Sequence, residues 1–176
     1  MIFTSTFETE LGTMIAGATE EGLCLLEFVD RLSLKSELDD LTQYLGDDIS
    51  EGENDQIAAV RKQLDEYFEG TRKSFDLKLI TPGTDFQQRV WKELLNIPYG
   101  TTRTYLQQSE ALGNKLAIRA VAGANGMNRI AIVIPCHRVI GSDGSLTGYG
   151  GGVKRKKWLL NHERLHSGKD VDLTLF

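Results

Sequence analysis

Three short runs of apolar and β-branched residues stand at the start of the chain. The runs cover residues 4–7, 14–18 and 23–28, and Gly12 and Gly22 punctuate them. Short runs of this kind between turn residues predict three β-strands.

The next two segments have apolar residues at helical spacing. Leucines recur at helical spacing over residues 33–46, and apolar residues do the same over 55–69, so each segment predicts a helix. The acidic stretch 46–54 contains two glycines and is typical of a loop. Apolar and polar residues alternate over residues 75–80 and predict a last strand. We expect a short antiparallel sheet with helices in this half.

Turn residues at positions 81–84 mark the point where the charge of the chain changes sign. Residues 1–84 carry 7 basic and 18 acidic residues, whereas residues 85–176 carry 13 basic and 7 acidic ones, within a net charge of −5. We therefore expect an N-terminal domain over residues 1–82 and a C-terminal domain over 83–176. A basic second half suits a polyanionic partner. The alternative is an acidic first half that is simply well solvated.

The second half is mostly helical by its pattern. Thr84 or Asp85 can cap a first helix, which Pro98 and Gly100 close. Two further helices joined by a short glycine turn form a helix-turn-helix. The expected elements after Gly100 are a helix from Thr101 or Thr102 through Leu112, a turn at 113–114, a helix over 115–128, a buried strand over 130–134, a glycine-rich loop over 148–152, a helix over 153–164 and a less ordered tail from Ser167. The predicted class is α+β, with a small mixed N-terminal domain and a mostly helical C-terminal one.

Composition excludes several classes of protein. Apolar residues make up 40% and charged residues 26%, which is ordinary for a globular chain and excludes a disordered, collagenous or coiled-coil one. No apolar run reaches the ~18 residues of a membrane span, and the start of the chain does not resemble a signal peptide. Cys24 and Cys136 are too few for a disulfide framework and form no CxxC motif. We expect a cytoplasmic protein with no membrane association.

Cys136 is the first candidate for chemistry. His137 and Arg138 follow it directly, and Pro135 precedes it. The thiolate is the reactive form of cysteine, and it needs a base or positive surroundings near neutral pH. Neighbouring side chains on an extended segment point apart, so we expect a bridging water between Cys136 and His137. The alternative is a buried and inert cysteine, which is also the simplest interpretation of Cys24.

His137 needs a third group to fix its tautomer. Glu163, on the last predicted helix, is one such carboxylate, and Asp143 is the nearer alternative in sequence. The other interpretation of Glu163 is a solvated acid near a helix end.

Other candidates are suited to ligand contact. Arg119 lies among small residues in an alanine-rich helix, where it can reach into a groove or form an ordinary surface charge. Tyr105 and Tyr149 carry rings that can contact a flat ligand, although most aromatic side chains belong to the core. The basic run over residues 154–157 is either a solvated face or a phosphate contact.

Residues 134–140 (Ile-Pro-Cys-His-Arg-Val-Ile) resemble the active-site signature of the O6-alkylguanine-DNA alkyltransferases, also called methylated-DNA–protein-cysteine methyltransferases, of the stand-alone bacterial type. The resemblance is dense over residues 83–164 and weak over residues 1–82. The further matching positions are 83–87, 90–91, 97–100, Tyr105, 119–121, Asn128, 147–149 and 159–163.

The resemblance implies direct-reversal DNA repair by a suicide enzyme. An alkyl group would pass from O6-alkylguanine, and from O4-alkylthymine, in double-stranded DNA to Cys136, once per molecule. The damaged base would first be flipped out of the helix from the minor-groove side, because its oxygen is shielded in the stack. No cofactor is implied, since the DNA itself is the alkyl donor, and we expect a monomer.

The resemblance also implies roles for single residues. His137 would take the thiol proton through a water, and Glu163 would orient His137. Tyr105 would help the guanine to leave, Arg119 would fill the gap in the base stack and Asn128 would brace the turn behind the site. The remaining expected substrate and DNA contacts are Ala120, Arg138, Val139, Tyr149 and Gly150.

Some positions depart from the family's usual pattern. Arg129 follows Asn128 where proline is usual, and this either alters the turn or adds a phosphate contact. Ile118 and Ala122 stand where alanine and glycine are common, so the groove-facing helix would fit less closely. Some relatives bind zinc in the first domain, but residues 1–82 contain one cysteine and no histidine, so we expect no metal.

Three other functions compete with alkyl transfer. A lesion-binding protein on the same scaffold would lack the cysteine, which Cys136 argues against. A helix-turn-helix regulator would need an effector domain that the chain does not obviously carry. A Cys-His hydrolase would need a directly paired dyad and an oxyanion hole, which an adjacent Cys-His pair serves badly.

Overall fold

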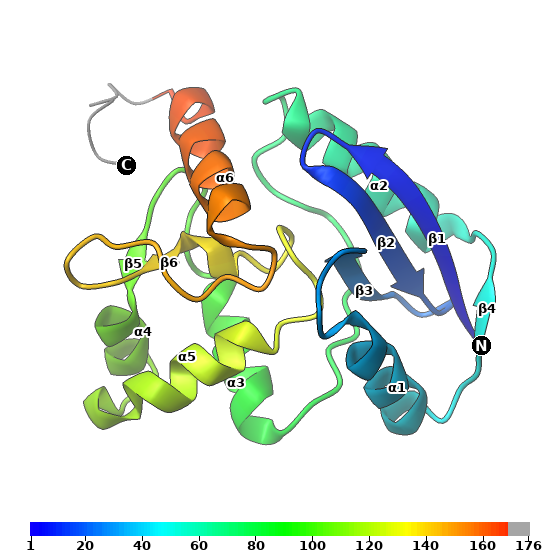
Figure 1. Cartoon of the computed structure of the whole chain (residues 1–176), viewed down its shortest axis with the longest axis horizontal. Helices are drawn as coiled ribbons and strands as arrows, with labels where there is room; N and C mark the ends of the chain where they lie inside the picture. Colours follow the sequence, from blue (N-terminus) through cyan, green and yellow to red (C-terminus); the bar gives the residue numbers. More distant parts are fainter. Residues whose placement is uncertain (169–176) are drawn as a thin grey trace. The chain divides into compact units, whose positions relative to one another are not determined.

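A computed structural model describes residues 1–168 of the chain, which divides into two compact units. Unit 1 contains residues 1–83 together with 129–131, and unit 2 contains residues 84–128 and those from 132 onward. The predicted α+β class is confirmed, since unit 1 contains the sheet and unit 2 is mostly helical (Figure 1). The exact boundary between residues 82 and 83 stays a prediction, and most of the expected tail lies outside the described residues.

The sheet of unit 1 has the order β3-β2-β1-β4. Strands β1 (Ile2–Thr9), β2 (Gly12–Ala18) and β3 (Leu23–Phe28) pair antiparallel, as predicted from the short runs. Strand β4 (Ile49–Glu51) pairs parallel with β1, so the sheet is mixed, and the expectation of a loop throughout residues 46–54 is wrong. The three residues of β4 are too few to show an alternating pattern in the sequence.

The predicted strand over residues 75–80 is also wrong. Only Leu79 pairs with the sheet, through a single bridge to Leu23. The backbone of Asp76 bonds instead to the side chain of Gln63, which donates to the Asp76 carbonyl at 2.8 Å and accepts from its N–H at 2.8 Å. Because this side chain takes the backbone groups that a strand would use, the ladder does not extend.

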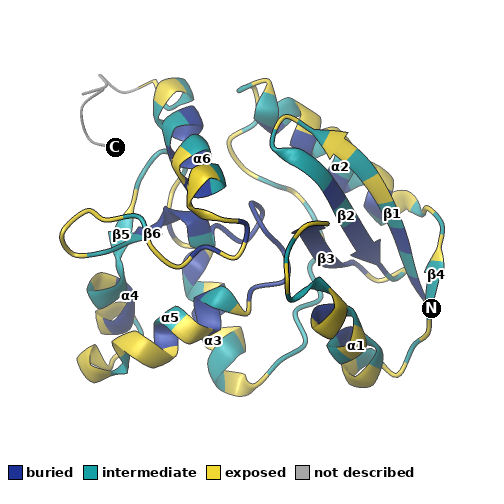
Figure 2. Cartoon of the chain, in the orientation of Figure 1, coloured by how far each residue is buried: buried dark blue, intermediate teal, exposed yellow. Residues whose placement is uncertain are grey.

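Two helices cover the sheet of unit 1. Helix α1 (Leu34–Leu45) places Leu41 against a cluster that includes Ile2, Cys24 and Leu25. Helix α2 (Asp55–Phe68) begins at Asn54, whose side chain accepts from the N–H of Ile57, and packs against the first three strands. Strand β3 is buried at all six positions (Figure 2), as expected for a strand covered on both faces.

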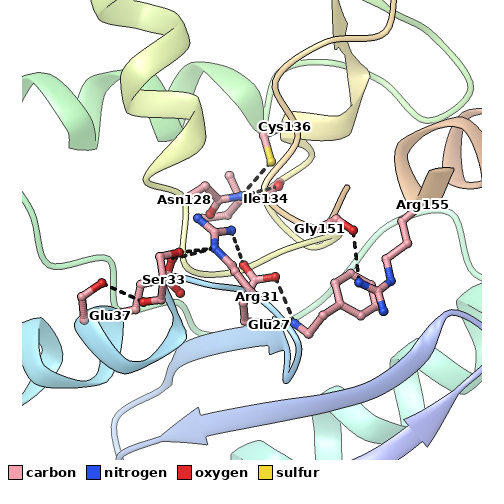
Figure 3. A network of polar contacts seen from close by, with 11 residues as sticks. Glu27, Arg31, Ser33, Glu37, Asn128, Ile134, Cys136, Gly151 and Arg155 are labelled. Atoms are coloured by element: carbon pink, nitrogen blue, oxygen red, sulfur yellow. Dashed lines mark hydrogen bonds and ion pairs between the residues drawn. The ribbon is translucent and has the colours of Figure 1, made fainter. Parts of the chain in front are cut away.

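A buried polar network joins β3 to the start of α1 in unit 1 (Figure 3). Arg31 donates to Glu27 at 2.6 Å, to Ser33 at 2.7 Å and to Glu37 at 2.8 Å. The side chains of Glu27, Arg31 and Glu37 are 0%, 9% and 4% exposed. One guanidinium thus faces two carboxylates away from water, so burial disfavours ionisation of at least one of them.

Unit 2 begins with helix α3, which a helix-turn-helix follows. Helix α3 (Asp85–Leu94) has a capping box made by Thr84 and Gln87, as the sequence predicts. Helix α4 (Tyr105–Ala111) is followed by a short turn, the 3₁₀ helix η1 (Lys115–Ala117) and helix α5 (Ile118–Gly126). The amides of Gln108 and Asn125 bond reciprocally at 2.9 and 2.7 Å and tie α4 to α5.

The start of α4 differs from the prediction by about one turn. Thr104, rather than Thr101 or Thr102, caps the helix and forms a capping box with Gln107. Residues Arg103–Thr104 form strand β5, which pairs parallel with β6 (Val139–Ile140). This long-range pairing is not visible in the local pattern.

The predicted buried strand over residues 130–134 is wrong. Ile130 makes one bridge to Leu26 within unit 1, and the following residues turn. Ile132 has φ 70°, a left-handed conformation that is strained for a β-branched residue. The segment is buried, which explains its apolar character, but its backbone leads through a turn to the 3₁₀ helix η2 (Cys136–Arg138).

Helix α6 (Val153–His166) ends the described part of unit 2, two residues beyond the prediction. No helix within residues 1–168 is long and apolar enough to cross a membrane.

Glu27 predicts a pH dependence of stability. Burial raises the pKa of Glu27 from 4.5 to about 7, although Arg31 opposes the shift. The folded chain therefore holds more protons than the unfolded chain within this window, and the stabilisation present below pH 4.5 is lost as pH rises through about 7. We expect the free energy of unfolding to fall by about 1–3 kcal/mol between pH 5 and 8 through this group, measured by urea titration.

Glu27→Gln should remove most of this slope, whereas Glu21→Gln, at an exposed acid, should keep it. If the free energy of unfolding of Glu27→Gln keeps the same dependence on pH, a group other than Glu27 binds the proton.

Candidate active site

Cys136 stands at the first position of η2, where it is half-buried. The side-chain amide of Asn128 donates to the Ile134 carbonyl at 2.9 Å and to Cys136 Sγ at 3.3 Å (Figure 3). One amide group thus braces the strained turn and touches the sulfur. This is the position expected for Asn128.

His137 and Glu163 form a buried pair, 0% and 1% exposed. His137 Nε2 lies 2.6 Å from Glu163 Oε1. With Glu163 ionised, Nε2 must carry the hydrogen, so Nδ1 of the neutral ring is an acceptor. Nδ1 is buried and has no hydrogen-bond partner within residues 1–168, so it does not bond directly to Cys136.

Glu163 is the centre of a wider network of donors. Arg138 donates through Nε to Oε2 at 2.8 Å and through Nη2 to Oε1 at 2.9 Å, a bidentate pair. The N–H of Gly100 donates to Oε2 at 3.2 Å. These contacts join α6 to η2 and to the turn before α4.

The pKa values of both Glu163 and His137 are lowered from their usual values. Burial alone would raise the pKa of Glu163, but His137 and Arg138 outweigh it and hold that pKa well below its usual value. Burial lowers the pKa of His137, against the attraction of Glu163. The pair is therefore a carboxylate and a neutral imidazole at neutral pH, with the imidazole able to accept a proton.

Tyr105 and the loop before α6 form another side of the site. Tyr105 OH donates to the Thr147 carbonyl at 3.0 Å, and a Cβ on Gly148 would lie 3.4 Å from that hydroxyl. Burial raises the pKa of Tyr105, and the charge of Cys136 adds to the shift. Tyr149 is 9% exposed and Gly150 is exposed.

Lys156 belongs to this region, and we interpreted it from sequence only as one member of a basic run. Its side chain is fully buried, and Nζ donates to the Thr147 carbonyl at 3.0 Å. Burial lowers its pKa to about 8, although Cys136 opposes the shift. The signal was available in the helical spacing, since Leu159, Leu160 and Glu163 follow Lys156 at i+3, i+4 and i+7 and are also buried.

The expected DNA contacts divide into exposed and buried residues. Arg119 and Ala120 are exposed on α5, as a groove-facing helix requires, whereas Val139 is buried in β6. Arg138 is 7% exposed, and besides Glu163 it donates to the Ile97 carbonyl at 2.7 Å. This geometry favours support of Glu163 over the expected contact with DNA.

The remaining candidates lie elsewhere. Asp143 is exposed and accepts from the N–H of Ser145 at 3.0 Å, so Glu163 rather than Asp143 meets His137. Arg129 is buried in unit 1, where it bonds to Asp40 at 3.0 Å and to the Pro82 carbonyl at 2.8 Å, which disfavours a phosphate contact. Cys24 is 1% exposed, and burial raises its pKa to about 11, as expected for an inert thiol.

We searched residues 1–168 for a cluster of side chains that could bind a metal ion. Within residues 1–168, no group of three or more histidine, cysteine, aspartate or glutamate side chains is arranged to hold an ion.

Two family models together match most of the chain. Residues 85–165 match the DNA-binding domain of 6-O-methylguanine DNA methyltransferase, and residues 2–81 match its ribonuclease-like domain. Curated relatives are named methylated-DNA–protein-cysteine methyltransferase. One from Methanosarcina barkeri is 45% identical over 89% of this chain and 93% of its own length, and a constitutive one from Bacillus subtilis is 40% identical over 94% and 97%.

Solved structures agree with this assignment. The Mycobacterium tuberculosis OGT in complex with DNA is 40% identical, covers 99% of each chain and has a TM-score of 0.82. An O6-methylguanine-DNA methyltransferase from Pyrococcus kodakaraensis is 26% identical, covers 93% of this chain and 99% of its own and has a TM-score of 0.63. The two units, the half-buried Cys136 and the buried His137–Glu163 pair beside it thus define a DNA methyltransferase of the alkyl-accepting class. The chain belongs to the 6-O-methylguanine DNA methyltransferase family.

A substitution at Gly100, whose N–H donates to Glu163, tests how much the close packing at this turn contributes to stability. Its φ is +71°, and a Cβ there would lie 2.6 Å from Ser167 Cβ and 3.2 Å from the Glu163 carbonyl. We expect Gly100→Ala to lower the free energy of unfolding by about 2–4 kcal/mol, through backbone strain and overpacking together.

Gly113→Ala is the matched control, because Gly113 has φ +84° and a Cβ there would meet nothing within 4 Å. Strain alone should cost about 1–2 kcal/mol at Gly113. Equal losses in the two variants, measured by denaturant titration, would show that the packing around Gly100 contributes nothing.

Proposed function

We propose that this protein repairs DNA by transferring the alkyl group of O6-alkylguanine to its own Cys136 in a single turnover. The observation that carries the proposal is the buried His137–Glu163 pair beside Cys136, with Nδ1 of His137 left as an acceptor. Family membership supports the coarser activity, DNA repair by alkyl transfer.

The reaction needs one proton to leave the thiol. Nδ1 of His137 accepts that proton through a bridging water, and the carboxylate of Glu163 stabilises the imidazolium that results. Cys136 Sγ then attacks the alkyl carbon, so that the S–C bond forms while the O6–C bond breaks. The guanine leaves and regains a proton, for which the hydroxyl of Tyr105 is the nearby donor.

The lesion must be brought out of the duplex before this step. A half-buried sulfur cannot reach an alkyl group that is shielded inside the base stack, so the damaged nucleotide rotates into the site. The exposed face of α5 enters the minor groove, with Ala120 allowing a close approach and Arg119 filling the gap in the stack. Val139, Tyr149 and Gly150 line the pocket for the extruded base.

The product limits each molecule to one reaction. A thioether sulfur is a poor leaving group, so water does not restore the thiol at a useful rate. O4-alkylthymine presents a comparable alkyl–oxygen bond and is proposed as a second substrate. The chemistry requires no cofactor, and we propose that one monomer is sufficient.

A Cys-His hydrolase is disfavoured by the same geometry. Hydrolases of that kind pair the base directly with the thiol, but His137 makes no direct bond to Cys136.

Intact-mass measurement after incubation with an O6-methylguanine oligonucleotide tests the transfer. We expect one added methyl group per protein, on the peptide that contains Cys136. Cys136→Ala should bind the same duplex and gain nothing. More than one equivalent of guanine released per protein would rule out a single-turnover acceptor.

Arg119→Ala should separate base extrusion from chemistry. Base flipping costs a few kcal/mol, so losing the residue that fills the gap should slow repair of duplex DNA by about tenfold or more. The reaction with free O6-alkylguanine should stay near the wild-type rate, because no stack needs to be opened. Equal losses on the two substrates, measured as second-order rate constants, would exclude this role.

A further inference from the structure

Two buried amide side chains join α4 to α5, which pack against each other in the helix-turn-helix (Figure 1). Gln108 of α4 is 0% exposed, and Asn125 of α5 is 4% exposed. Gln108 Nε2 donates to Asn125 Oδ1 at 2.9 Å, and Asn125 Nδ2 donates to Gln108 Oε1 at 2.7 Å. Because each amide is both donor and acceptor to the other, the two bonds form together only in a narrow range of helix positions.

Stability alone does not explain why an amide pair occupies this interface. Burying two amides costs hydration that the hydrogen bonds between them only partly return, and apolar side chains of the same shape are often equally stable there. Hydrogen bonds, unlike apolar contacts, depend on direction. A buried polar pair can therefore fix a register that apolar packing leaves open.

The other contacts of α5 leave its orientation less well defined. Besides Asn125, its buried residues are Val121 and Ala124, which are small. Trp91 Nε1 of α3 donates to the Ala124 carbonyl at 2.8 Å, and this single bond leaves the helix able to pivot about it. A slip of one residue moves a helix by about 1.5 Å and turns it by about 100°, which would break both bonds between Gln108 and Asn125.

Asn125 also connects α5 to the acceptor sulfur. Its carbonyl accepts from the N–H of Asn128 at 3.2 Å, and the side chain of Asn128 donates to Cys136 Sγ at 3.3 Å. Arg119 is exposed near the start of the same helix, six residues before Asn125, which corresponds to about 9 Å along the axis. The position of α5 therefore determines where Arg119 lies relative to Cys136.

We propose that Gln108 and Asn125 are positioning residues for base extrusion, and that their amide pair fixes α5 against α4 so that Arg119 stands at the distance from Cys136 that a flipped nucleotide requires. This inference rests on the proposed function. Neither amide contacts the substrate. Without the pair, Asn128 keeps its own bonds at the acceptor site, so the chemistry persists while Arg119 is misplaced.

The double variant Gln108→Met, Asn125→Leu tests the proposal in the full-length protein. Its apolar side chains match the amides in size, so its melting temperature should equal or exceed that of the wild type. The second-order rate constant for repair of an O6-methylguanine duplex should fall by about tenfold or more, because displacements of about 1 Å are costly. The rate constant for free O6-alkylguanine should stay near the wild-type value, since a free base enters the site without help from α5.

The decisive quantity is the duplex rate constant divided by the free-base rate constant. Both rates come from the same preparation, so a partly unfolded variant loses them equally and keeps the ratio. The exchange variant Gln108→Asn, Asn125→Gln retains two amides and their summed length, and it should recover most of the ratio. If the apolar double variant does not fold, the same ratio in Gln108→Met decides. Gln43→Met, at an exposed amide on α1, is the control and should leave the ratio unchanged.

A wild-type ratio in the variants that lack the pair would overturn the proposal, because α5 would then be positioned without these amides. An exchange variant whose ratio is as low as that of the apolar pair would overturn it as well. A wild type that takes up no methyl group from either substrate would instead refute the proposed function itself.

Discussion

Taking a carboxylate out of water is costly unless donors replace the lost hydration, and Glu163 meets this condition through contacts that come from two parts of unit 2. His137 and Arg138 reach it from η2, and the backbone of Gly100 reaches it from the turn before α4. The ionised state of Glu163 sets the tautomer of His137, which leaves Nδ1 as the acceptor. Removal of any one donor would leave a buried charge underpaired, so the site is a single electrostatic unit rather than a set of separate residues.

The sulfur lies beside this unit, because Cys136 directly precedes His137 in η2. Arg138 neutralises Glu163, and burial favours the neutral form of His137. The amide of Asn128 donates to the sulfur at 3.3 Å. A hydrogen bond donated to sulfur stabilises the thiolate that forms when His137 takes the proton under the proposed function.

Local patterns predicted those elements that depend on local interactions. The first three strands follow from short runs between turn residues, and both helices of unit 1 and the capped start of α3 follow from helical period and capping residues. The failures all involve partners distant in sequence. Gln63 takes the backbone groups of Asp76, and β6 fixes residues 103–104 before α4 begins. For the site, motif spacing located Cys136, His137 and Glu163. It assigned Arg138 to DNA contact and Lys156 only to a basic run, because basic side chains are usually solvated and only tertiary packing buries these two.

A site built in this way suits an acceptor that reacts once. Ile132 holds a strained φ of 70° in the turn behind the sulfur, and Lys156 holds a charge away from water. Both features raise the free energy of the folded chain. Under the proposed function, the site has to activate the sulfur only once. Alkyl transfer converts the thiol into a thioether, which has no proton for Nδ1 of His137 to accept.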